Sequence, residues 1–356
     1  MADINLQYAM AIETQTTLGT ISTAVAGLTT PVTIADGLIY GDADSGTRGT
    51  GIEFSTEPKL QERGSVAGSK TALIDSYLGI ETVANFTVTM PFTGSLVDVG
   101  GALADSDFDL ATHYPALDAL LRCCGLVGAG GAGDSWDYTP VLAAGTTEFC
   151  SAMIWDSGFV HGVKDIRGDF SIKYDPGEVP IITFTLQGIV DTAATQTATF
   201  PATVTYGVWL TEQFQAAESA VTAEWAGTIR SFTELEVASD NKLTAVKDIT
   251  ADEGKRVKLG SPRVYTLSGT MIANSADARA EYDAMVGTGA GDTYVLQIGA
   301  ATAINTNADA HKLTMTGLRP TTVKTIDLEE TGSKGVEFEA TLSNTVDGAE
   351  FALNFL

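Results

Sequence analysis

Two short segments of this chain, far apart in the sequence, are near copies of each other. The stretch IEFSTEPKL (52–60) is echoed by LEVASDNKL (235–243), and both run from an apolar–acid–apolar triplet through an acid to Lys-Leu. An internal duplication decides the architecture of a whole chain, because each copy must fold in the same way. The echo predicts two similar halves.

Further pairs of segments follow in the same order. The corresponding residues are Phe86, Val88 and Phe92 with Tyr265, Leu267 and Met271; LDALL (117–121) with YDAMV (282–286); and Ile182, Phe184 and Leu186 with Val336, Phe338 and Ala340. Strand, strand, helix and late strand thus recur in one order, which predicts a duplicated domain. Chance similarity among short amphipathic segments is the alternative.

The repeated segments are mainly strand-like. FTVTMPF (86–92), IITFTL (181–186) and VEFEA (336–340) alternate apolar and polar residues, the period of half-buried strands. YPALDALL (114–121) and RAEYDAMV (279–286) instead carry apolar residues at helical spacing, each with a glycine soon after it. The chain is therefore expected to be mainly β, with one short α-helix in each half.

The domain boundary is expected near residues 200–211, at the end of an Ala/Thr-rich stretch. Residues 1–50, rich in Thr, Ala and Gly, are interpreted as an N-terminal segment or arm. The first domain then spans 51–205 and the second, divergent repeat spans 206–356.

The composition indicates association with other subunits. Only 18% of the residues are charged, against about 25% in typical domains, although the net charge is -25. Few charges and many small residues favour a surface that other copies cover. A weakly charged monomer is the alternative. The excess of acids argues against tight binding of nucleic acid, which depends on Lys and Arg.

The cysteines and the N-terminus predict a cytoplasmic site of synthesis. The chain has three cysteines, Cys123, Cys124 and Cys150, in no CxxC pair, which favours a reducing compartment. MADINLQYAM lacks a signal-peptide pattern, and no apolar run reaches membrane-spanning length. No membrane association is expected.

No motif predicts an active site, so the chain is interpreted as a protein that is not an enzyme, without metal or cofactor. Gly128, Gly130 and Gly133 spell GxGxxG, but a helix precedes them rather than a strand, which favours a plain loop. The DxDxD motif at 105–109 lacks the glycine and the final glutamate of a calcium loop. The histidines have neither metal-ligand spacing nor a triad signature. Cys123 and Cys124 are interpreted as buried apolar residues.

Polar residues of the repeated strands are expected to share one face of a sheet. If the apolar residues face the core, the opposite face carries Glu53, Thr183, Thr185, Gln187, Glu236, Glu337, Glu339 and Thr341. Either this is an ordinary solvated face, or it lines a channel whose contents must not adhere.

Basic residues gather in the segment between the first two strands of each half. They are Arg63 and Lys70 in 61–84, and Lys255, Arg256 and Lys258 in 244–262. Solvated loops are one interpretation. The other is that paired basic loops on an acidic body dock onto an acidic neighbour.

The stretch KDIRGDFSIKYDPGEVPIITFTLQG (164–188) resembles the closing strands of tail tube proteins, the major tail proteins of phages with long non-contractile tails. HYPALDALLRCCGL (113–126) is similar to the helix that packs on the sheet in that family. In the second half, GSKGVEFEATLSN (332–344) matches more weakly.

This resemblance implies two tandem tail-tube-like β-sandwich or barrel domains, each with a short flanking helix. It implies homotrimeric rings with pseudo-sixfold symmetry, stacked into a tube in the virion after assembly in the host bacterial cytoplasm. The long loops, here 61–84 and 244–262, would bridge successive rings. The implied partners are the tape-measure, tail terminator and distal tail proteins, with double-stranded DNA passing through. A head-decoration or other virion β-protein is the alternative.

Simple geometry is consistent with such a tube. If six domains each give about four strands, ~24 strands spaced ~4.8 Å apart and tilted by ~45° close at a diameter of roughly 50 Å. The lumen would admit a DNA duplex. A basic wall would hold DNA by releasing its counterions, whereas an acidic wall lets it slide.

Overall fold

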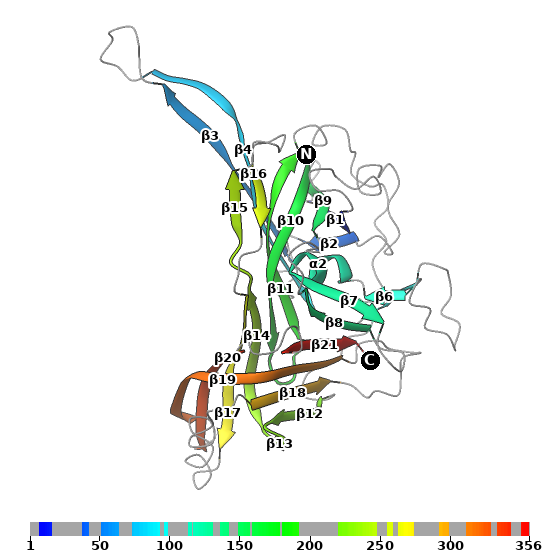
Figure 1. Ribbon diagram of the computed structural model, residues 1–356, viewed down its shortest axis with the longest axis vertical. Helices are drawn as coiled ribbons and strands as arrows, with labels where there is room; N and C mark the ends of the chain where they lie inside the picture. Colours follow the sequence, from blue (N-terminus) through cyan, green and yellow to red (C-terminus); the bar gives the residue numbers. More distant parts are fainter. Residues whose placement is uncertain are drawn as a thin grey trace, which may run out of the picture.

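The computed structural model describes residues 7–15, 38–42, 51–63, 73–92, 96–98, 113–115, 117–130, 136–141, 149–156, 159–178, 180–191, 220–247, 255–258, 263–273, 292–298, 311–328, 333–342 and 350–355. Within these ranges the chain is mainly β, as the sequence predicts, with one short helix. Figure 1 shows an elongated molecule from which strands β3 and β4 project as a ribbon.

The elements of the first half alternate with stretches outside the described ranges. They are β1 (Gln7–Thr14), β2 (Leu38–Asp42), β3 (Gly51–Arg63), β4 (Leu73–Pro91), β5 (Leu96–Asp98), β6 (His113–Pro115), α2 (Asp118–Cys123), β7 (Leu126–Gly130), β8 (Trp136–Pro140), β9 (Cys150–Asp156), β10 (Phe159–Tyr174) and β11 (Ile181–Asp191). The elements of the second half are β12 (Ala220–Trp225), β13 (Thr228–Ile229), β14 (Phe232–Asp240), β15 (Thr244–Lys247), β16 (Lys255–Lys258), β17 (Val264–Ala273), β18 (Asp292–Ile298), β19 (His311–Leu328), β20 (Ser333–Leu342) and β21 (Phe351–Phe355).

The strands of the two halves pair in the same spatial order, and all of these pairs are antiparallel. In the first half the order is β2-β1-β9-β10-β11-β4-β3. In the second half it is β13-β12-β18-β19-β20-β17-β14. Each strand of one series therefore has a counterpart at the same place in the other.

One continuous row of strands crosses from the first half into the second. The end of β10 pairs with β14, where Ser171 lies opposite Ala238 and Tyr174 opposite Leu235. The row, called the long sheet below, therefore reads β3-β4-β11-β10-β14-β17-β20-β19. A second connection runs through β21, which pairs with β19 and with β8.

The core lies between the long sheet and the remaining strands. The first part of β10 pairs with β9 and that of β19 with β18, while their later parts belong to the long sheet. Along β11, buried Ile182, Phe184 and Leu186 alternate with more exposed residues, which confirms the predicted period of two. The buried cluster draws on both halves and includes Met10, Ile154, Phe170, Phe184, Leu267, Leu313 and Phe338.

The ladders refine the correspondence between the two halves. Ile52 pairs with Val88, and its counterpart Leu235 pairs with Gly269. In β4 and β17, Val88 therefore corresponds to Gly269, and Phe86 corresponds to Leu267. This correspondence differs by two residues from the one that the sequence predicts from apolar spacing. Because the side-chain period is two, this shift leaves every residue on its predicted face.

The helix of the first half is shorter than predicted. Residues 113–115 form β6, which pairs with β5, so α2 begins only at Asp118. Arg122 Nε donates to Asp118 Oδ2 at 2.6 Å, one helical turn away. Gly125, at φ 83°, then takes the left-handed conformation that ends helices. The second predicted helix, 279–286, lies outside the described residues.

Two segment assignments change in the structure. Part of the segment 1–50 belongs to the body rather than to a separate arm, because β1 pairs with β9 along its length. The segments 61–84 and 244–262, interpreted as loops, contain β-ribbons: β3 with β4, and β15 with β16. The predicted domain boundary at 200–211 lies outside the described residues.

Candidate functional site

The residues predicted from the first half to share a face do so by register. Glu53 pairs with Thr87, and Thr87 pairs with Thr185 on the next strand. Thr183 and Gln187 follow at alternate positions of the same strand, β11. Directly opposite residues of a ladder lie on the same side of a sheet, so these residues lie on one face.

The same face continues through the second half. Lys173 at the end of β10 pairs with Glu236, which pairs with Ser268. Ser268 pairs in turn with Glu339, and Glu339 with Thr322 of β19. The ladders therefore connect the predicted residues of both halves in unbroken rows across the long sheet. This face is called the polar face below.

Sequence reasoning missed about half of the residues on the polar face. The ladders add Asn85, Thr87, Thr89, Ser171, Lys173, Glu234, Ser268 and Thr322 to Glu53, Thr183, Thr185, Gln187, Glu236, Glu337, Glu339 and Thr341. Alternation along each strand was a usable signal for β4 and β17. The sequence does not predict the pairing of β10 with β14, because the register between two strands depends on both strands together.

Hydrogen bonds between neighbouring strands hold part of this face. Thr89 Oγ1 and Thr183 Oγ1 lie 3.2 Å apart, and Gln187 Nε2 donates to Asn85 Oδ1 at 2.9 Å. Cross-strand pairs of this kind each stabilise a sheet by about 0.2–1 kcal/mol. The first-half part of the polar face is thus rich in hydroxyl and amide groups, with Glu53 and Lys173 as the charged residues named above.

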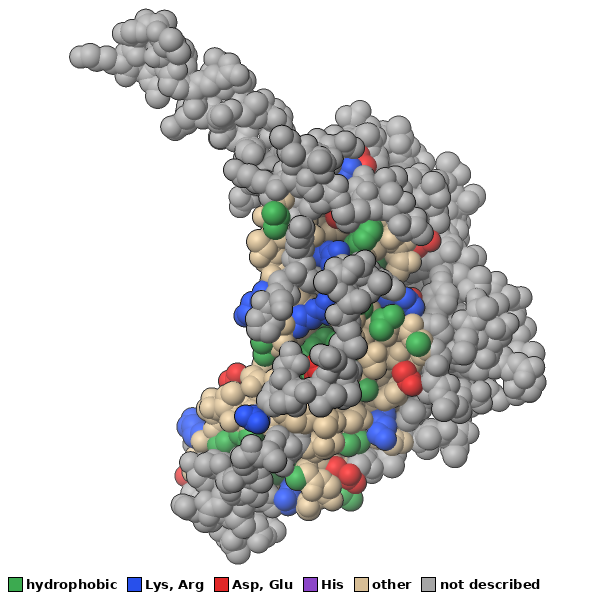
Figure 2. Space-filling view, in the orientation of Figure 1, with side chains coloured by type: hydrophobic (Ala, Val, Ile, Leu, Met, Phe, Trp, Pro, Cys, Tyr) green, Lys and Arg blue, Asp and Glu red, His purple; other side chains and the backbone are tan. Residues whose placement is uncertain are grey.

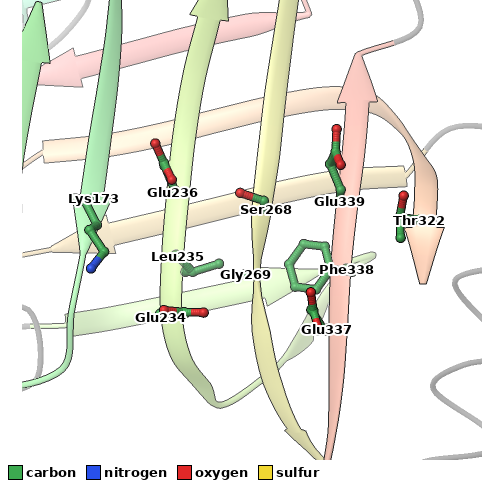
Figure 3. Close-up of a pocket in the computed structure, with 10 residues that line it drawn as sticks. All are labelled: Lys173, Glu234, Leu235, Glu236, Ser268, Gly269, Thr322, Glu337, Phe338 and Glu339. Atoms are coloured by element: carbon green, nitrogen blue, oxygen red, sulfur yellow. The ribbon is translucent and has the colours of Figure 1, made fainter. Parts of the chain in front are cut away.

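The second-half part is acidic. Glu234, Glu236, Glu337 and Glu339 line a shallow depression of about 240 Å³. Figure 3 shows them on β14 and β20, which flank β17, with Lys173 at one side and Thr322 at the other. Lys324 Nζ lies 3.4 Å from Glu337 Oε2, and Lys173 Nζ lies 2.9 Å from Asp175 Oδ2. Both lysines are exposed, so these pairs add little stability. The acids outnumber the bases along this part of the sheet.

The predicted basic residues lie on the ribbons. Arg63 is the last residue of β3, opposite Leu73. Lys255, Arg256 and Lys258 belong to β16, where they pair with β15. Lys70 lies outside the described residues. Figure 2 shows acidic, basic and hydrophobic side chains interspersed over the described surface on the side seen in Figure 1.

The three cysteines of the chain lie in the buried core. Cys123, Cys124 and Cys150 form no disulfide and are fully buried, which confirms the interpretation of Cys123 and Cys124 as core residues. Burial raises the pKa of the Cys123 and Cys124 thiols, so they stay protonated and poorly nucleophilic at neutral pH. Among the described residues, no group of His, Cys, Asp and Glu side chains is arranged to hold a metal ion.

His311 lies in the core rather than at a surface site. Its Nε2 lies 3.1 Å from the Tyr174 hydroxyl, and its ring contacts Phe92 edge to face. In the described ranges, no helix has the length and apolarity needed to cross a membrane.

No protein-family model matches this chain, and no curated protein matches its sequence.

Proposed function

We propose that this chain is the structural subunit of a phage tail tube, in which stacked rings surround a lumen through which DNA passes. The observation that supports this proposal most directly is the polar face, which runs across both halves without interruption. An ordinary solvated face needs only to be polar. A lumen wall needs polar side chains on every strand of a sheet that continues from subunit to subunit.

The repeated strand order supports two tandem tail-tube-like domains. Each half gives four strands to the long sheet, and the halves join edge to edge through β10 and β14. Three copies would supply about 24 strands, enough to close around a duplex-sized lumen. We therefore infer trimeric rings with pseudo-sixfold symmetry, each half supplying one sixth.

The charge of the face fits such a conduit. Basic groups on a wall would replace the counterions of DNA and hold it in place. The glutamates at 234, 236, 337 and 339 instead repel phosphates, while the hydroxyl-rich part of the face offers no strong partner. The subunit would act in the virion tail with tape-measure, terminator and distal tail proteins, and the role is structural rather than enzymatic.

Charge reversal on the polar face tests the proposal. The double variant Glu337→Lys with Glu339→Lys is expected to form tails of normal length on electron micrographs but to deliver DNA at least roughly tenfold more slowly, because the wall gains phosphate partners. The matched control, Glu337→Gln with Glu339→Gln, removes charge without adding a base and is expected to deliver DNA at nearly the normal rate.

The outcomes separate the candidate functions. Normal infectivity of the lysine variant would argue against a lumenal position for this face. Antibody labelling of heads rather than tails would favour the alternative, a head-decoration protein.

A further inference from the structure

The two halves differ in the neighbours of the later part of two corresponding strands, β10 in the first half and β19 in the second. In the first half, the later part of β10 has β11 on one side and β14 on the other. In the second half, the corresponding part of β19, residues 319–328, pairs with β20, and its opposite edge has no ladder among the described residues. Among the described residues, no strand lies beside β19 in the position that β14 fills beside β10.

The opposite end of the long sheet has the complementary property. β3 pairs with β4 on one side, and no ladder of the described chain lies on its other side. Its counterpart β14 uses that second side to pair with β10. One molecule thus carries the counterparts of both strands of the internal junction, β19 and β3, and neither has a ladder on the corresponding edge in the described part of the chain.

We propose that residues 319–328 of β19 pair with β3 of a second copy of this chain, in the register that β10 uses with β14. Pairing is antiparallel, as at the internal junction. Closure of such pairs into a ring of three rests on the proposed tail-tube function, whereas the pairing itself rests on the repeated strand order.

The ladders define the register on the β19 side. Phe170 pairs with Phe184 in the first half, and Val323 pairs with Phe338 in the second. Since Phe184 and Phe338 are counterparts, Val323 takes the place of Phe170. Lys324 therefore takes the place of Ser171.

The register on the β3 side follows in the same way. Phe54 pairs with Phe86, and Val237 pairs with Leu267. Ser55 is thus the counterpart of Ala238. Because Ser171 lies opposite Ala238, the proposal places Lys324 opposite Ser55 of the second copy.

The outer edge of β19 carries charged residues and a proline, which limit strand pairing with unrelated chains. Arg319, Lys324 and Asp327 are exposed along it, and Pro320 lacks a backbone donor. Charged residues and prolines are the means by which edge strands avoid indiscriminate pairing. At the positions of Lys324 and Asp327, β10 carries Ser171 and the buried Tyr174, and the neighbouring strand β14 belongs to the same chain.

The two junctions also differ in strength. At the internal junction, Asn241 Nδ2 donates to Gly168 O and to Cys124 O, both at 2.8 Å. The repeat places Pro58 at the counterpart of Asn241, and proline has no side-chain amide. The junction between copies therefore lacks this clamp and is the more easily opened of the two.

Cysteine cross-linking tests the register. In the variant Ser55→Cys with Lys324→Cys, the new thiols of neighbouring copies would lie directly opposite each other, within disulfide distance. The native cysteines are buried and do not compete. The chain is assembled on added tail tips, oxidised, and separated without reductant. Covalent dimers and trimers are expected, with no larger species.

The matched control is Ser55→Cys with Thr322→Cys, which moves one thiol by two residues on the same face. Diagonal neighbours in a ladder lie too far apart for an unstrained disulfide, so roughly tenfold less cross-linking is expected. A second pair in the proposed register, Glu53→Cys with Ile326→Cys, guards against failure of one variant.

The outcomes distinguish the proposed junction and its register from the proposed tail-tube function. If rings form on electron micrographs but neither pair in the proposed register forms a cross-link, the proposed junction is wrong. The tail-tube function would then remain supported. Stronger cross-linking of the shifted control would overturn the register. Cross-linked trimers that never stack into tubes would support the junction and contradict the tail-tube function.

Discussion

The β3–β4 ribbon of the first half and the β15–β16 ribbon of the second half occupy corresponding places in the sequence. They differ in whether they extend from the body or pack against it. In the first half, β3 and β4 continue their ladder beyond the sheet and project from the body (Figure 1). In the second half, β14 ends at Asp240, and the short ribbon of β15 and β16 lies against β10 and β11. One ribbon extends outward, and the other is fixed to the body.

A small number of contacts explain the difference. Lys242 has a φ of 51°, a left-handed conformation that turns the chain between β14 and β15. Beside it, the Asn241 backbone N–H donates to Asp169 Oδ1 at 2.6 Å. Val257 of β16 is buried, and Arg263 Nη1 donates to Gly125 O at 2.9 Å. The second ribbon therefore stabilises the junction of the halves.

The sequence predicts that both ribbons bridge successive rings, and the two arrangements bear on this expectation differently. A bridging element must extend beyond its own subunit, which the β3–β4 ribbon does. We propose that it carries ring-to-ring contact in a tail tube. The ribbon of β15 and β16 packs on β10 and β11 of its own chain, and a role of Lys255, Arg256 and Lys258 between rings stays a prediction.

The largest expected effect comes from making the halves alike at one core position. Gly269 is the counterpart of Val88, and a Cβ there would lie 2.5 Å from Glu234 O and 2.9 Å from Leu235 Cδ2. Gly269→Val is therefore expected to lower the free energy of unfolding by about 3 kcal/mol or more. Ser268→Val, one residue away on the polar face, should change it by about 0.5 kcal/mol or less. Chemical denaturation measures both, and equal effects would contradict the close packing at Gly269.

The next effect concerns the clamp at the junction. Asn241→Ala leaves the carbonyls of Cys124 and Gly168 without this donor in a buried site, and about 2–3 kcal/mol of stability should be lost. The control Asn85→Ala removes an exposed amide, and a loss of about 0.5 kcal/mol or less is expected. Hydrogen exchange should be faster at β14 in Asn241→Ala. Unchanged exchange there would show that the clamp does not hold the ribbon.

The smallest effect compares two buried tyrosines. The Tyr174 hydroxyl lies 3.1 Å from His311 Nε2, across the two halves, whereas the buried Tyr294 hydroxyl has no hydrogen-bond partner among the described residues. Tyr174→Phe is expected to cost about 1 kcal/mol, and Tyr294→Phe to be neutral or stabilising. Thermal unfolding of the two variants provides the measurement. A larger loss of stability in Tyr294→Phe than in Tyr174→Phe would contradict the inference that only the Tyr174 hydroxyl forms a stabilising hydrogen bond.

Alternation along single strands was enough to predict which side chains share a face. Thr183 and Glu337 were placed correctly because the period of two holds wherever a strand forms. The ribbons were missed because 61–84 and 244–262 contain glycines and charges without clear alternation. Asn241 gave no signal either, since its partners Cys124 and Gly168 lie far away in the chain and approach only after the halves have joined.

The pairing of β10 with β14 inside one chain also affects how rapidly a ring could form. Partners joined by a covalent connection meet at an effective concentration on the order of millimolar, whatever the amount of protein in the cell. A sixfold ring of separate single-domain subunits has six junctions between chains, whereas a ring of chains that carry two domains has three. The remaining junctions form as each polypeptide folds. In the proposed tube, duplication would thus make ring formation less dependent on subunit concentration, which matters most early in synthesis, when copies are few.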